Sequence, residues 1–250
     1  MTSTIASRPF LSLVILTMVV THASSMHCGA APTLDERQEK KWDALIDAMA
    51  SRNASPKLEK VGTVTLPVFL PNFDWKEQDR VRKALVAVAR EDSPDLWERL
   101  VDHLEDRRYA LTIRDNGPNA ENYSVGDLCR IVAERRLLFV SRQRSDPNSR
   151  ERSDIYLDVG IENLAKWRKE RLNKSIYELQ IEVCENANKQ LAFVDNITEA
   201  ARTRIREKIQ ANIAQLKKSR SPLFFKTPLD GYEFFDAEEA TAIRDRLNKR

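Results

Sequence analysis

The sequence predicts a mainly α-helical protein. Charged residues make up 32% of the 250-residue chain and hydrophobic residues 42%, whereas aromatic residues make up 7% and there are 6 glycines. This composition is typical of helices with salt-bridged outer faces, because β-propellers and jelly rolls need many glycine turns and aromatic residues. Apolar residues also recur every three or four positions in several segments. We expect a helical N-terminal half and a long C-terminal helical hairpin, with at most one or two short β-strands.

An N-terminal helical domain is expected over residues 33–140. Four of its segments carry apolar residues along one face of a helix, which predicts that each is half-buried. They are 33–52, 75–90, 94–104 and 128–138. Residues 109–113 are expected as a short strand. Residues 61–70 are rich in β-branched side chains and form an edge strand at best, because Pro67 lacks a backbone donor.

Part of this domain resembles a HEAT-type helical repeat. The resemblance covers residues 78–109, about 32 of 250, and rests on Asp79-Arg-Val-Arg82, Ala84-Leu85 and Leu104-Glu-Asp106. It implies a HEAT-like N-terminal half. No second copy follows at a fixed period, and a solenoid needs about three stacked units to bury its faces, so a helical bundle is the other expectation. The helices on either side of Glu91-Asp-Ser93 are expected to pair antiparallel.

The C-terminal half is expected to begin after an Arg-rich linker, 141–155. Its arginines could hold an anionic polysaccharide, a lipid headgroup or nucleic acid, but without interleaved aromatic residues a solvated loop is the stronger interpretation. These candidate anion-binding residues are Arg142, Arg144, Arg150 and Arg152. Two regular apolar stripes then predict a helical hairpin over 156–220. An aromatic loop and a short terminal helix are expected over 221–250.

The first residues predict export. One positive charge precedes an apolar run over 10–20, which is the arrangement of a signal peptide. The run is too short to cross a bilayer, which needs roughly 18 residues or more. We expect a signal peptide over 1–23, with cleavage positions as late as residue 31, no transmembrane helix afterwards, and a secreted or periplasmic location. The segment from Asp106-Arg-Arg-Tyr109 through Val125-Gly-Asp-Leu-Cys129 is also similar to exported bacterial helical proteins of unknown function. This resemblance does not point to any particular activity.

Charge and motifs exclude several function classes. The formal net charge of +3 provides no strong field for nucleic acid, so no nucleic-acid partner is expected. No glycine-rich phosphate loop is present, and we expect no cofactor. Close-spaced pairs of zinc ligands are absent as well, so we expect no metal site.

His103 is the outside candidate for catalysis. It is expected on a helix with Asp102 and Asp106 nearby, so a carboxylate could orient its imidazole as an acid or base. The stronger interpretation is an ordinary exposed histidine paired with Asp106, because the sequence offers no activated serine beside it.

Two cysteines are candidates for a disulfide. Cys129 and Cys184 are expected on separate helices, and in an oxidising compartment a bond between them would join the two halves. The alternative is two buried, reduced cysteines that act as small apolar side chains. Cys28 lies in the region of signal processing and is expected to be trimmed, terminal or lipidated.

The sequence therefore favours an exported, non-catalytic scaffold or protein-binding protein. It favours this function mainly by the absence of catalytic motifs, and the expected partner is another protein outside the cytoplasm, with an anionic polymer as a further option. The alternative is a hydrolase of a cell-envelope or extracellular polymer that uses paired carboxylates.

Overall fold

The computed structural model describes most of the chain. The described residues are 34–115, 117–138, 161–195, 197–223, 229 and 232–249. The expected signal peptide, 1–23, and the Arg-rich linker, 141–155, lie outside them. Among the helices in the described ranges, none combines the length and the apolar character that crossing a bilayer requires.

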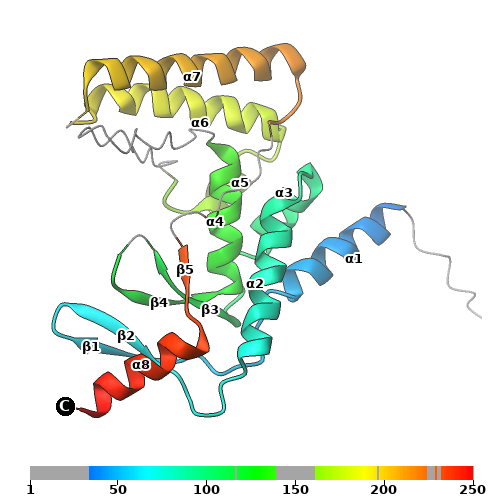
Figure 1. Ribbon diagram of the computed structural model, residues 1–250. Helices are drawn as coiled ribbons and strands as arrows, with labels where there is room; N and C mark the ends of the chain where they lie inside the picture. The colour runs from blue at the N-terminus through cyan, green and yellow to red at the C-terminus, as the bar shows by residue number, and fades with distance from the viewer. Residues whose placement is uncertain are drawn as a thin grey trace, which may run out of the picture.

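The mainly α-helical class is confirmed (Figure 1). Eight α-helices and one 3-10 turn lie in the described ranges. They are α1 (Leu34–Asp47), α2 (Trp75–Arg90), α3 (Pro94–Asp102), α4 (Val125–Leu137), α5 (Leu164–Lys169), α6 (Ile176–Gln190), η1 (Leu191–Phe193), α7 (Glu199–Ser219) and α8 (Ala237–Asn248). Five short strands accompany them, more than the one or two expected. They are β1 (Lys57–Val61), β2 (Val64–Val68), β3 (Tyr109–Asp115), β4 (Ala120–Ser124) and β5 (Tyr232–Phe234).

The strands form two small antiparallel sheets. β1 and β2 make a hairpin in which Pro67 lies opposite Leu58, and the second sheet has the order β4-β3-β5. Gly62 in the β1–β2 turn has a positive φ, a left-handed conformation that glycine adopts without strain. β5 has only three residues and no periodicity of its own. It is a strand because it pairs with β3, with Phe234 opposite Ile113. No local sequence pattern predicts this pairing.

The largest core lies among α1, α2, α3, α4 and β3, and α5 and the first turns of α6 also contribute to it. Trp97 is fully buried there, and its indole Nε1 donates a hydrogen bond to the carbonyl of Ala133 at 3.0 Å. α3 packs chiefly against α1, α4 and α5, whereas α2 packs against α1, α4 and β3. The expected antiparallel pair of α2 and α3 is therefore not the main packing of either helix, because α1 and α4 cover the apolar faces of both.

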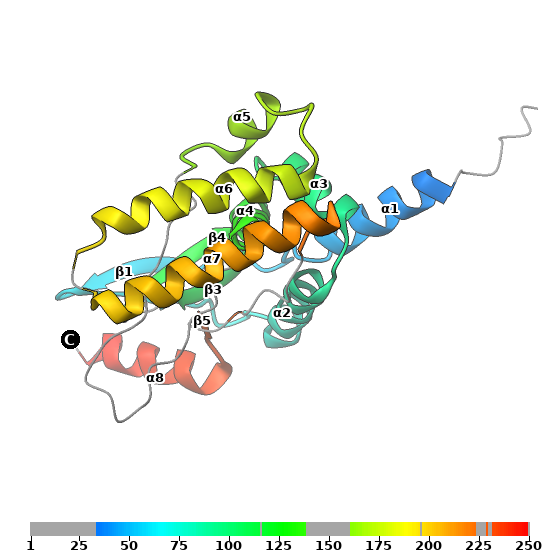
Figure 2. The same ribbon diagram turned by 90° about the horizontal axis from the view of Figure 1, so that it is seen from above.

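The C-terminal hairpin is confirmed as a pair of long helices, α6 and α7 (Figure 2). Ser175 begins α6 with a capping box, in which its backbone N–H donates to Glu178 Oε2 at 2.8 Å. The apolar stripes of the two helices meet in a second core that includes Leu191, Ile209 and Ile213. Figure 1 shows the hairpin lying across one end of the molecule, with the β-strands and α8 toward the other.

Buried polar groups attach the hairpin to α4. Gln180 of α6 is fully buried, and its amide nitrogen donates to the carbonyls of Arg136 and Leu223 at 2.9 and 2.8 Å. Arg136 itself is buried, and its guanidinium donates to the carbonyls of Val88, at 2.8 Å, and Glu91 near the end of α2. One buried arginine and one buried glutamine thus join α2, α4 and α6.

α8 closes the opposite end of the molecule. Its Ile243 packs with Val61, Leu66 and Phe235 in a third core between the β1–β2 hairpin and the helix. Arg114 of β3 lies 4.2 Å from the centre of the Phe235 ring and also forms an ion pair with Glu239 of α8. The C-terminal helix is therefore attached to both sheets.

Gly126 allows α4 to begin close to the loop between α3 and β3. Its backbone N–H donates to the carbonyl of Asp106 at 2.9 Å. A Cβ atom at this position would overlap the carbonyl oxygen of Leu104, which is backbone and cannot rotate away. The glycine is required by this contact and not by its backbone angles.

We expect Gly126→Ala to lower the free energy of unfolding by about 1–3 kcal/mol, because the added methyl group forces α4 away from the loop. Urea unfolding of the variant would measure the loss. Gly62→Asn is the control, because the space around Gly62 is open and asparagine tolerates a positive φ. Equal stabilities of the Gly126→Ala variant and the unchanged protein would contradict this account of the contact.

Candidate functional site

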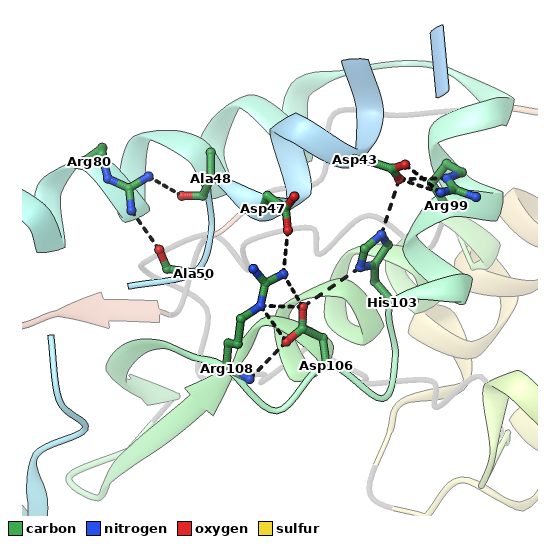
Figure 3. Close-up of polar contacts among 9 residues, drawn as sticks. All are labelled: Asp43, Asp47, Ala48, Ala50, Arg80, Arg99, His103, Asp106 and Arg108. Carbon is green, nitrogen blue, oxygen red and sulfur yellow. Dashed lines mark hydrogen bonds and ion pairs between the residues drawn. The ribbon is translucent and has the colours of Figure 1, made fainter. Parts of the chain in front are cut away.

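His103 lies at the end of α3 between two carboxylates (Figure 3). Its Nδ1 is 4.0 Å from Asp106 Oδ2, the partner expected from the sequence, and its Nε2 is 3.4 Å from Asp43 Oδ1. Asp43 belongs to α1, and the sequence gives no sign of its contact because sixty residues separate it from His103 in the chain. Asp102 bonds to Arg99 instead, at 3.1 Å.

Arginines neutralise both carboxylates beside His103. Asp43 accepts two hydrogen bonds of 2.7 Å and one of 2.9 Å from Arg99, and Asp106 accepts several from Arg108. Partial burial raises the pKa of the Asp43 carboxyl, but hydrogen bonds from Arg99 and His103 outweigh it and leave this pKa below its ordinary value. Hydrogen bonds from Arg108 lower the pKa of Asp106. Both carboxyl groups are therefore ionised near neutral pH.

This arrangement joins helices and lacks the features of a hydrolytic site. Glycoside hydrolysis needs one carboxylic acid with a raised pKa beside an ionised carboxylate. Neither Asp43 nor Asp106 has a raised pKa. The thiol of Cys129 is buried, and burial raises its pKa to about 12, so it is not a thiolate nucleophile at neutral pH. Within the described ranges, no three His, Cys, Asp or Glu side chains are grouped so that they could hold a metal ion.

A second charge cluster stabilises the end of α1. The guanidinium of Arg80 on α2 donates to the carbonyls of Ala48 and Ala50, at 2.7 Å each, just past the last turn of α1, where carbonyls lack partners within the helix. Glu77 orients this arginine through a bond of 2.8 Å to its Nε and also accepts the backbone N–H of Arg52. Figure 3 shows Arg80 reaching both carbonyls beside the His103 cluster, so both clusters hold α1 in place.

The two cysteines correct one expectation. Cys129 on α4 and Cys184 on α6 are both free and buried, and they lie in separate cores. The expected disulfide is therefore not formed, because each side chain packs among the apolar residues of its own core. The alternative, two reduced cysteines acting as small apolar side chains, describes the structure. Burial raises the pKa of Cys184 to about 11.

The outer side of α7 is basic. This helix of 21 residues packs chiefly on α6, and its buried side is apolar. Four exposed cations on or just after it form no ion pair with any described residue. They are Arg204, Arg206, Lys218 and Arg220. The apolar stripe of α7 predicts a core face. The same periodicity places Arg204 and Lys218 away from this face, whereas Arg206 lies at its flank and Arg220 follows the last turn of the helix.

The four linker arginines named as a candidate anion site lie outside the described residues. No family model matches this chain, and no similar protein was found among curated proteins or solved structures.

Glu77 should make stability depend on acidic pH. The hydrogen bond from Arg80 lowers its pKa from 4.5 to about 2. Since the folded-state pKa is depressed, the ionised group stabilises the fold above about pH 4.5, and this contribution is lost as the pH falls toward 2. We expect Glu77→Gln to cost roughly 1–3 kcal/mol at pH 7 and to flatten the loss of stability between pH 4.5 and 2. Urea unfolding across this range, with the exposed Glu238→Gln as control, would show whether the two curves differ.

The thiols should be inaccessible in the folded protein and reactive once it unfolds. Alkylation with iodoacetamide without reductant, followed by peptide mass spectrometry, is expected to label neither Cys129 nor Cys184 in the native protein and both in denaturant. A peptide pair linked through these two cysteines in the native protein would contradict the structure.

Proposed function

We propose that this protein is an exported, non-catalytic scaffold that binds an acidic surface of another protein outside the cytoplasm through α7. The observation that carries the proposal is the set of exposed cations on this helix that no described acid neutralises. Charged groups of this kind attract a partner of opposite charge and orient it on the surface. The apolar run at residues 10–20 supports export.

The placement of α7 also favours binding. The hairpin lies across one end of the molecule, and α7 is remote from α8 (Figure 1). With 21 residues, this helix extends over nearly six turns, enough to present a long surface to a partner. Its buried residues, including Ile209 and Leu216, keep it attached to α6, so the side chains on its outer side are not part of the core.

The charge clusters elsewhere support a non-catalytic role. At His103 and at Arg80, the acids and bases are used to attach one helix to another, with distances of 2.6–3.4 Å in most pairs. The carboxyl groups in these pairs have lowered pKa values, so they are ionised near neutral pH and cannot serve there as general acids. We therefore keep the hydrolase as the weaker alternative.

Charge reversal on α7 tests the proposal. The triple variant Arg204→Glu, Arg206→Glu, Lys218→Glu is expected to reduce recovery of the bound protein by about tenfold or more, because attraction becomes repulsion. The measurement is affinity capture of the exported, tagged protein from its native compartment, quantified by mass spectrometry. Circular dichroism would establish that the variant is folded.

The matched control carries the same charge change on and just after α8: Arg244→Glu, Arg246→Glu, Lys249→Glu. These side chains are also exposed. The control is expected to recover the same partner as the unchanged protein. Equal recovery by the α7 variant, or equal loss in both variants, would contradict binding through α7.

A further inference from the structure

A pocket opens on the surface of α2, away from the hairpin. Its volume is 490 Å³. This size is usual for a site that binds a small molecule. Five side chains from the first three turns of α2 line it. They are Trp75, Lys76, Asp79, Arg80 and Lys83. The pocket therefore combines one large aromatic wall with four charged groups.

The indole of Trp75 is held in place by two phenylalanine rings. The rings of Phe69 and Phe73 each lie 4.9 Å from it, centre to centre, at tilted angles, and Phe69 also contacts Phe235. Asp74 fixes the start of α2 at the same point, since its carboxylate accepts the backbone N–H groups of Lys76 and Glu77. A rigid aromatic wall costs little conformational entropy when a ligand packs on it.

The charges around the pocket differ in how far they are already paired. Arg80 is fully engaged with Glu77 and the end of α1. Asp79 lies between Arg82 and Lys83, at 2.6 Å from each. Lys76 is exposed and forms no ion pair within the described residues, so it is the cation most free to bind a ligand.

The paired state of Arg80 limits what kind of anion fits. Its guanidinium is already engaged and cannot donate the two parallel hydrogen bonds with which an arginine binds a carboxylate or a phosphate. The single charge of Lys76 then matches a carboxylate, which carries one negative charge, better than a phosphate group, which carries nearly two. Beside it, the indole offers an apolar face, and the Asp79 carboxylate accepts hydrogen bonds from hydroxyl groups.

We propose that this pocket binds a carboxylated sugar unit of an acidic polysaccharide. The apolar face of the sugar ring packs on Trp75, its carboxylate pairs with Lys76, and a ring hydroxyl donates to Asp79. The pocket only binds, because Asp79 is the one acid among the five lining residues and its pKa is lowered, chiefly by hydrogen bonds from Lys83 and Arg82. Binding in this pocket does not depend on binding through α7.

The test is titration of the exported protein, labelled with nitrogen-15, with trigalacturonate while the indole N–H signals are followed by NMR. The Trp75 signal is assigned with Trp75→Phe. It is expected to shift and saturate, and the neutral sugar maltotriose is expected to bind about tenfold more weakly, because it lacks the carboxylate. Added salt should weaken the binding of trigalacturonate.

Lys76→Gln supplies the decisive comparison, because this exposed side chain is not part of the core and its loss should leave the fold intact. We expect it to weaken trigalacturonate binding by about tenfold, whereas Lys189→Gln, an equally exposed change on α6, should not. An unmoved Trp75 signal, equal binding of maltotriose, or unchanged affinity of Lys76→Gln would overturn the proposal. Equal displacement of the Trp75 signal by sulfate would overturn it too, since it would indicate an unspecific anion site.

Discussion

The fold depends on how the guanidinium of Arg136 is accommodated in the interior. Moving a charge out of water is costly, and burial lowers the pKa of this arginine to about 10. The structure offsets the cost by directing carbonyl groups at it from the end of α2, at Val88 and Glu91. The backbone of the same residue then accepts a hydrogen bond from Gln180 of α6. A change in the position of α4 would therefore disturb α2 and the hairpin together.

Some charged groups near the surface attach one helix to another, whereas others are free to bind a partner. Arg80, Arg99 and Arg108 join the ends and sides of helices to their neighbours. α7 differs, because Ile209 and its apolar neighbours already attach it to α6, and the exposed Arg204, Arg206 and Lys218 have no such role among the described residues. Lys76 at the Trp75 pocket is likewise exposed and attaches no described helix to another.

Sequence reasoning predicted part of the His103 cluster and missed the rest for a clear reason. Asp106 lies three residues from His103, a spacing that brings side chains together on one helix or its end. Asp43 comes from α1, and only the packing of α1 on α3 brings it within 3.4 Å. The disulfide prediction was wrong for a similar reason. Helix spacing places Cys129 and Cys184 on apolar faces, but only the packing shows that Leu179 and Val183 of α6 join the core of Cys129, whereas Cys184 joins the core shared with α7.

The sequence by itself determined the helical class, the starts of α2 and α3, and the presence of a C-terminal hairpin of two helices with apolar stripes. Capping residues and apolar periodicity act over a few residues and can be seen locally. Only the tertiary structure decided that α2 and α3 pack on different neighbours and that β5 joins β3. These outcomes depend on contacts between distant segments, whose free energies are set by packing and charge burial and leave no periodic trace in the chain.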